Sequence, residues 1–202
     1  TNAVTPGVRG AVIAGGGAAT DTDRGVINVG PNRVTDVYGS VLGGFNNRAG
    51  NDTGTVLDAV GATVGGGVIN RATAPGSTVG GGGSNTASGL GSVVAGGATN
   101  LASGYGSAIS GGTFNVASGD YSTVLGGSNN RASATYSVAA GHDAHADEVG
   151  CIMFSSWSTL AASRCGTPYT MRFYANHGMS VDYLTPNSGG GLRWLYIGDL
   201  DG

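Results

Sequence analysis

The sequence predicts an all-β protein built as a parallel β-solenoid, in which fifteen-residue coils stack along one axis. Three observations support this prediction. A phrase with a small apolar segment, glycines and Asn-x-Ala-Ser recurs at a constant fifteen-residue spacing between Thr78 and Ser137. That period is too short for the helix pairs of most repeat families, but it accommodates two short strands and two tight turns. The 202-residue chain also holds 41 glycines and only 10% charged residues, so it has little bulky material for a thick core.

The composition argues against several other classes of protein. A mean hydropathy of +0.05 and a net charge of −3 are unlike a disordered chain, which is polar and highly charged. Glycine does not recur at every third residue, which excludes collagen. The acidic balance gives no basic surface for nucleic acid, and no apolar run reaches the length of a membrane-spanning helix. We therefore expect no nucleic-acid partner and no membrane span.

The repeat defines a predicted β-roll domain over residues 1–147, in which we count eight coils. The first copy begins at Val12 and resumes at Asn32, after an insertion near residues 18–30. A second insertion follows the next copy, near residues 51–60. From Val64 the repeat runs without interruption to a degenerate last copy at residues 138–142.

Equivalent positions of successive coils are expected to stack into ladders. The β-branched residues favour strands, and the paired glycines supply the positive φ angles that a sharp corner needs. Stacked asparagines can hydrogen-bond to one another and to the turn backbone. The apolar ladder is Val64, Val79, Val94, Ile109 and Val124; the small one is Ala72, Ala87, Ala102, Ala117 and Ala132; the polar one is Asn47, Asn70, Asn85, Asn100, Asn115 and Asn130.

Arginines share a further register, directly after the asparagines. We expect them to pair with a neighbouring chain or with backbone carbonyls, and an anion site is the alternative. The four residues are Arg33, Arg48, Arg71 and Arg131.

Because the inward side chains are small, a single stack of coils buries little apolar area. Burial at about 25 cal/mol per Å² hardly offsets roughly 1–2 kcal/mol of backbone entropy per ordered residue. Association of several rolls along their lengths would supply the missing burial, and closed cyclic symmetry is its usual form.

The repeat carries a resemblance to a known family. The pattern Ser-x-Val-x-Gly-Gly-x-x-Asn-x-Ala-Ser-Gly-x-Tyr-Ser resembles the YadA-like head domains of trimeric autotransporter adhesins, over about residues 8–147. The resemblance implies a left-handed parallel β-roll, a homotrimer and an extracellular location on a bacterial surface. The heptad stalk and anchoring barrel of complete adhesins have no counterpart in these residues, which leaves the means of anchoring open.

Residues 148–202 are predicted to form a small β-rich C-terminal domain. The segment starts at residues 151–157, and strands are expected at residues 171–175, 179–184 and 192–197, with Asn176-His177-Gly178 as a hairpin turn. This segment resembles one in bacterial surface and phage tail-fibre proteins that precedes an endosialidase-type intramolecular chaperone. Cys151 and Cys165 would close a fifteen-residue loop, worth roughly 3 kcal/mol as a disulfide; two buried thiols are the alternative.

The sequence offers no convincing catalytic or cofactor site. His142, Asp143 and His145 are weak metal candidates, and a solvated turn at the end of the roll fits them better. No phosphate loop follows the Gly-Gly corners, and no serine lies in a nucleophile elbow. We therefore expect a non-enzymatic protein without cofactors.

The predicted function is that of an extracellular fibre or adhesin module that binds a host-cell surface, matrix or glycan receptor. Recognition is expected in the insertions and in the C-terminal segment, because loops on a rigid scaffold carry specificity. The candidate contact residues are Arg24, Asn51, Asp52, Trp157, Tyr174 and Trp194.

Three alternatives stay open. They are a phage or tail-like receptor-binding fibre tip, a self-assembling extracellular filament and an ice-binding solenoid. The last needs a regular outward threonine ladder, and the repeat threonines do not all share one register. These are Thr78, Thr86, Thr99, Thr113 and Thr123.

Overall fold

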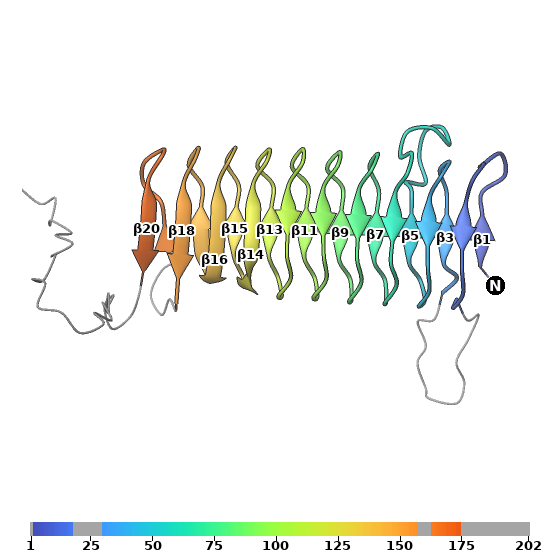
Figure 1. Ribbon diagram of the computed structural model, residues 1–202, viewed down its shortest axis with the longest axis horizontal. Coiled ribbons are helices and arrows are strands. Elements are labelled where there is room, and N and C mark those ends of the chain that lie inside the picture. The colour runs from blue at the N-terminus through green and yellow to red at the C-terminus, as the bar shows by residue number, and fades with distance from the viewer. Residues whose placement is uncertain (1, 18–29, 157–162, 175–202) are drawn as a thin grey trace, which may run out of the picture.

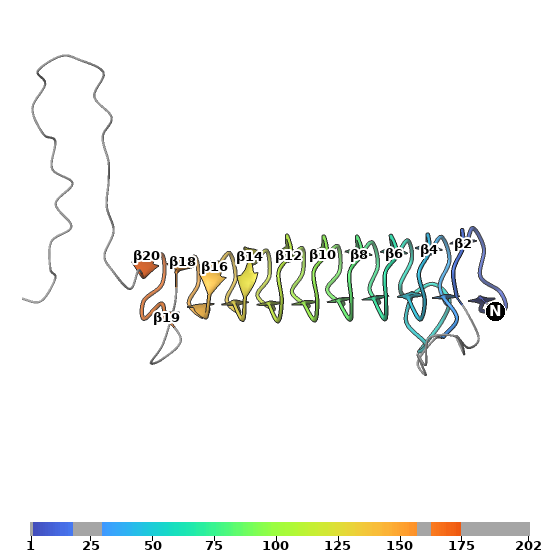
Figure 2. The same cartoon turned by 90° about the horizontal axis from the view of Figure 1, so that it is seen from below.

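The chain folds as a narrow rod of stacked β-coils. A computed structural model describes residues 2–17, 30–156 and 163–174, which form twenty β-strands and no helix (Figure 1). Odd-numbered strands make one ten-stranded sheet, here called sheet A, and even-numbered strands make another, sheet B. Figure 2 shows the two sheets as opposite sides of the rod. All strand pairings are parallel, so the predicted parallel β-solenoid is confirmed.

Most strands are only two residues long, because each coil turns a corner after one inward and one outward side chain. Sheet A contains β1 (Ala3–Val4), β3 (Arg33–Val34), β5 (Arg48–Ala49), β7 (Arg71–Ala72), β9 (Thr86–Ala87), β11 (Leu101–Ala102), β13 (Val116–Ala117), β15 (Arg131–Ala132), β17 (Ala144–Ala146) and β19 (Ser163–Arg164). Sheet B contains β2 (Val12–Ile13), β4 (Ser40–Val41), β6 (Thr63–Val64), β8 (Thr78–Val79), β10 (Val93–Val94), β12 (Ala108–Ile109), β14 (Thr123–Ser128), β16 (Val138–His142), β18 (Ile152–Ser155) and β20 (Met171–Tyr174).

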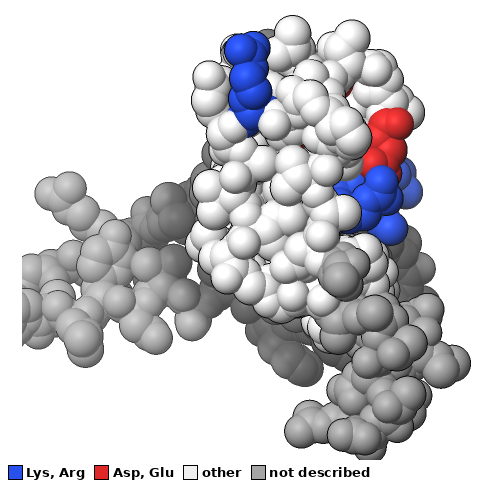
Figure 3. Space-filling model, turned by 90° about the vertical axis from the view of Figure 1, so that its right-hand side faces the viewer, with Lys and Arg blue, Asp and Glu red and all other residues white. Residues whose placement is uncertain are grey.

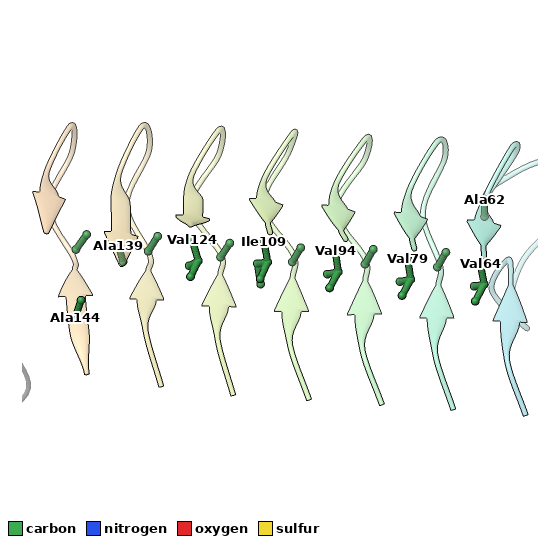
Figure 4. Packing of buried hydrophobic residues seen from close by; sticks show 14 of the residues in the cluster. Ala62, Val64, Val79, Val94, Ile109, Val124, Ala139 and Ala144 are labelled. Carbon is green, nitrogen blue, oxygen red and sulfur yellow. The ribbon is translucent and has the colours of Figure 1, made fainter. Parts of the chain in front are cut away.

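The fifteen-residue period is the register of the sheets. Val94 of β10 pairs with Val79 of β8 and with Ile109 of β12, one period before it and one period after it. The predicted valine and alanine ladders are fully or almost fully buried and form one core along the rod. Figure 4 shows the apolar ladder with one member on each successive coil.

The asparagine ladder lies at the corner between sheets B and A. The side-chain Nδ2 of Asn100 donates hydrogen bonds to the carbonyl oxygens of Gly96, at 3.0 Å, and Gly112, at 2.9 Å. Its Oδ1 accepts a 3.0 Å hydrogen bond from the backbone N–H of Asn115 in the next coil. The same pattern repeats along the rod, so each buried asparagine satisfies the backbone of its own coil and of the next one.

A row of buried serines lies at the other corner, where sheet A leads back to sheet B. Ser77 Oγ donates a 2.7 Å hydrogen bond to the carbonyl oxygen of Ala74 and accepts a 3.1 Å bond from its N–H. The buried hydroxyls of Ser92, Ser107 and Ser122 have no hydrogen-bond partner within the described part of the chain. Serines at equivalent positions of the coils therefore differ in what they contribute to the stability of the fold.

This difference gives a testable prediction. Ser77→Ala is expected to lower the free energy of unfolding by about 1–2 kcal/mol, because it removes two buried hydrogen bonds. Ser107→Ala is expected to be neutral or to stabilise by up to about 1 kcal/mol, because it removes a buried hydroxyl that has no partner among the described residues. Urea denaturation followed by circular dichroism measures both variants, and equal losses would contradict the assignment.

The solenoid extends further than the eight coils counted from the sequence. Strand β1 precedes the first recognisable copy, and β18, β19 and β20 continue both sheets beyond residue 147. Met153 of β18 pairs with Ala139 and is 2% exposed, so it takes a place in the apolar ladder. The described part of the predicted C-terminal domain thus continues the roll. The predicted Asn176-His177-Gly178 hairpin and the strands at 179–184 and 192–197 lie outside the described residues.

A disulfide joins the two cysteines inside this continuation. Cys151 and Cys165 are buried, with their Cα atoms 6.4 Å apart. Cys165 follows β19 and occupies the small-residue ladder after Ala146, whereas Cys151 lies just before β18. The bond therefore ties together two neighbouring coils at the C-terminal end of the described strands.

Candidate interaction surfaces

The outer face of sheet B is uncharged over its whole described length. Two outward rows flank the buried ladder, and neither contains an Asp, Glu, Lys or Arg. The first row is Val12, Ser40, Thr63, Thr78, Val93, Ala108, Thr123, Val138, Ile152 and Met171. The second is Ala14, Leu42, Gly65, Gly80, Ala95, Ser110, Leu125, Ala140, Phe154 and Phe173.

Several large apolar side chains stand out from this face into solvent. Leu42 is 55% exposed and Leu125 50% exposed. Near the C-terminal end, the rings of Phe154 and Phe173 are stacked, with centroids 5.1 Å apart. A continuous uncharged strip with exposed leucines and phenylalanines is typical of a surface that another protein covers.

Sheet A presents the opposite chemistry, because its outward row contains the arginines. Arg33 Nη2 lies 2.9 Å from Asp52 Oδ1, and Arg48 pairs with the other oxygen of the same carboxylate. Arg131 and Arg164 both lie 3.4 Å from Asp147. Figure 3 shows acidic and basic groups in contact on one side of the N-terminal end of the rod.

These ion pairs differ from the pairing expected from sequence, which was with a neighbouring chain or with backbone carbonyls. The partners of Arg33, Arg48 and Arg131 are aspartates of the same chain. Arg71, on β7, has no ion-pair partner among the described residues. The insertion carries Asp52 over the outside of sheet A, and Asp147 follows the last strand of the predicted roll. Neither aspartate has an equivalent in the other coils, so the repeat alone did not reveal them.

Exposed tyrosines line the corner that leads from sheet A to sheet B. The rings of Tyr105 and Tyr121 meet edge to face at 5.1 Å, and those of Tyr121 and Tyr136 stack at 5.4 Å. Tyr38 and Tyr169 occupy the position of Tyr121 and Tyr136 in coils near the two ends of the described rod, whereas Tyr105 lies one residue earlier in its own coil. The sequence signal for this row is the tyrosine of the Gly-x-Tyr-Ser turn, which recurs with the period of the repeat.

The weak metal candidates are divided between two strands. His142 ends β16, with Nδ1 3.1 Å from Asp143 Oδ2, whereas His145 lies on the outer face of β17. Among the described residues, no group of three His, Cys, Asp or Glu side chains is placed to hold a metal ion. Burial lowers the pKa of His145; Asp147 opposes this shift, and Arg164 and Arg131 reinforce it.

The predicted contact residues fall into three groups. Asn51 and Asp52 line a cavity of about 270 Å³ at the second insertion. Tyr174, at the end of β20, is 53% exposed. Arg24, Trp157 and Trp194 lie outside the described residues, as does most of the first insertion.

Comparison with known proteins adds no identification. No protein-family model matches the chain, and no curated protein matches it in sequence. Among the described residues, no helix is long and apolar enough to cross a membrane.

Proposed function

We propose that the chain is a non-enzymatic, extracellular fibre or adhesin module that works as a homotrimer of left-handed β-rolls, like the YadA-like heads that its repeat resembles. The observation that carries this proposal is the uncharged outer face of sheet B, set opposite a face with a row of arginines, four of which pair with aspartates of the same chain. Sheet B is the proposed trimer interface. Sheet A and the second insertion face outward, and these surfaces, with the first insertion, contact a cell surface, matrix or glycan.

The size of the face favours a ring of three over a pair. Ten strands spaced by about 4.8 Å, with three residues of about 3.3 Å each, give a strip of roughly 480 Å². Stable interfaces bury about 800 Å² per partner, so one such contact is small. In a closed trimer each chain contacts two neighbours, so the corners on either side of sheet B are buried together with the strip, and this supplies the burial that the thin core lacks.

Two outward residues of one coil provide a matched test. Val93 on sheet B is 39% exposed and Leu101 on sheet A is 37% exposed. Sedimentation of the unaltered chain is expected to give three times the chain mass of 19.7 kDa. Val93→Lys is expected to shift the protein to the single-chain mass, because lysine charges would face one another at the interface, whereas Leu101→Lys is expected to leave the trimer intact.

Two sedimentation results would contradict the proposed trimer or its interface. A stable monomer of the unaltered chain with a native β-type circular dichroism spectrum would exclude the trimer. Equal dissociation by both substitutions would move the interface away from sheet B.

The alternatives differ in observable ways. A phage or tail-like fibre tip would also be trimeric, and the segments that flank this chain in its full-length protein would distinguish it from an adhesin. A filament would appear as polymers in purified material. Ice binding predicts thermal hysteresis; against it, Val93 and Ala108 interrupt the outward row that contains Thr78 and Thr123.

A further inference from the structure

The second insertion builds a cavity that the repeat itself does not have. It opens where residues 51–56 pass over the outside of sheet A, and its volume is about 270 Å³. In Figure 1 the insertion rises from the edge of the rod between β5 and β6, and in Figure 2 it projects on the side of sheet A. The residues used below all line it: Thr5, Arg33, Asp52, Thr53, Thr55 and Val56.

A buried carboxylate fastens the insertion to the rod. Asp36 is 1% exposed. Its Oδ2 accepts hydrogen bonds from the N–H of Asn51, at 2.9 Å, and from Thr35 Oγ1, at 3.0 Å. Its Oδ1 accepts a 3.2 Å bond from the N–H of Ala59. One side chain thus holds both ends of the loop, and the cavity wall is already in place before any ligand binds.

Bonds within the loop fix its shape further. The N–H of Thr53 donates to Asn51 Oδ1 at 3.2 Å, and the N–H of Thr55 donates to Asp58 Oδ2 at 3.1 Å. These side chains act on the backbone and leave the hydroxyls of Thr5 and Thr53 without a partner among the described residues. The hydroxyl of Thr55 accepts a 3.3 Å hydrogen bond from the N–H of Leu57 and can still donate one. A preformed pocket loses less entropy on binding than a loop that must first become ordered.

The charges around the cavity are balanced, because the two guanidinium groups of Arg33 and Arg48 are matched by the two carboxylates of Asp36 and Asp52. Asp52 lies between Arg33 and Arg48 and pairs with both, so its carboxylate is neutralised by groups of the same chain. A metal cation would have to compete with these guanidinium groups, and an anion would meet the carboxylate. The surface therefore favours a neutral ligand that can both donate and accept hydrogen bonds.

The other residues of the cavity wall are also suited to a neutral ligand that donates and accepts hydrogen bonds. The hydroxyls of Thr5, Thr53 and Thr55 can each donate and accept, and Val56 adds an apolar contact. We propose that this cavity binds one ring of a neutral saccharide, with hydroxyl groups bound to Asp52, Arg33 and the threonines and a C–H face against Val56. The volume, just below that of pockets for drug-sized ligands, suits one ring or the end of a chain.

This inference rests on the proposed adhesive role and names its ligand class. Saturation-transfer NMR on the full chain is the direct test, with glucose, galactose, mannose, N-acetylglucosamine and N-acetylgalactosamine as probes. We expect transfer to at least one of these sugars. Thr53→Trp, which fills the cavity, and Asp52→Asn, which removes the carboxylate, are each expected to weaken binding at least tenfold.

Ser103→Trp, at an exposed site in a distant coil, is the matched control and is expected to bind as the unaltered chain does. The proposal fails if none of the five sugars receives saturation, or if both cavity variants bind as well as the control. It fails equally if calcium or inorganic phosphate, titrated calorimetrically, binds at the cavity more tightly than every sugar. Sedimentation of the same samples separates the two proposals, because a trimer that binds no sugar overturns the ligand class alone.

Discussion

Replacing Asn100 by alanine is expected to lower the free energy of unfolding by about 3–5 kcal/mol. The substitution leaves the carbonyl oxygen of Gly96 and the N–H of Asn115 without a partner. It also removes one of two hydrogen bonds to the carbonyl oxygen of Gly112, which still accepts from the N–H of Ala98. Each unsatisfied buried group costs about 1–3 kcal/mol. Asn100 is 1% exposed, so water cannot replace the lost bonds without opening the coil. Denaturant titration followed by circular dichroism measures the loss.

Ser103→Ala is the control for this substitution. Ser103 lies in the same coil, but its side chain is exposed and makes no hydrogen bond with the described residues. A change within about 0.5 kcal/mol is expected, as for most surface positions. If Asn100→Ala were no worse than this control, the asparagine ladder would not be what stabilises the corners.

Replacing Gly97 by alanine is expected to cost about 3 kcal/mol or more, because two penalties add. The residue has a φ of +91°, in the left-handed region, where a side chain alone costs about 1–2 kcal/mol. An added Cβ would also lie 2.1 Å from the carbonyl oxygen of Gly112 and 2.8 Å from Nδ2 of Asn100. Neighbouring coils would have to separate at this corner. Hydrogen exchange at the amides of the two coils, together with denaturation, detects the change.

The preceding residue is a close control. A Cβ added at Gly96 would have no atom within 4 Å, and the residue has no positive φ angle. Gly96→Ala is therefore expected to be neutral, or to stabilise by about 0.4–1 kcal/mol through a less flexible unfolded chain. Equal destabilisation at both positions would show that the corner does not have the described backbone geometry.

Much of the roll could be predicted because the constant spacing of the repeat equals the register of the sheets. The positions of Val94 and Asn100 recur once in every period, and a parallel solenoid places such residues on top of one another. The paired glycines were predicted together, yet in the coil of Gly96 and Gly97 only the second adopts a positive φ. Because both residues of the pair are glycine, the sequence does not show which one needs the positive φ. In the structure only Gly97 lies close to the next coil.

The ends of the roll could not be predicted, because their residues depart from the phrase. Ala3 and Val4 form a strand without the Gly-Gly corner, and Met153 takes the place of a valine. The register also shifts between Val124 and Gly126, after which the next coil is one residue shorter. Backbone hydrogen bonding tolerates such changes, whereas a search for a fixed spacing does not.

The candidate binding site was predictable only as a location. Asn51 and Asp52 are candidates because the insertion interrupts the repeat. The cavity depends on Asp36, whose role as the anchor of the insertion has no sequence signature, and on Arg33 from an earlier coil. Contacts between an irregular loop and a regular scaffold are set by the conformation of the loop, which no periodicity records.

The direction of the backbone hydrogen bonds has a mechanical consequence. They join coil to coil, as from the N–H of Ala95 to the carbonyl oxygen of Ile109, and therefore lie along the rod. Tension applied to the ends of one chain loads the coils one after another, and each coil that peels away releases about 50 Å of extended chain. The Cys151–Cys165 bond holds back its own loop from this extension. Under tension, the module is therefore an extensible tether that lengthens one coil at a time. The disulfide limits this extension at the C-terminal end of the described strands.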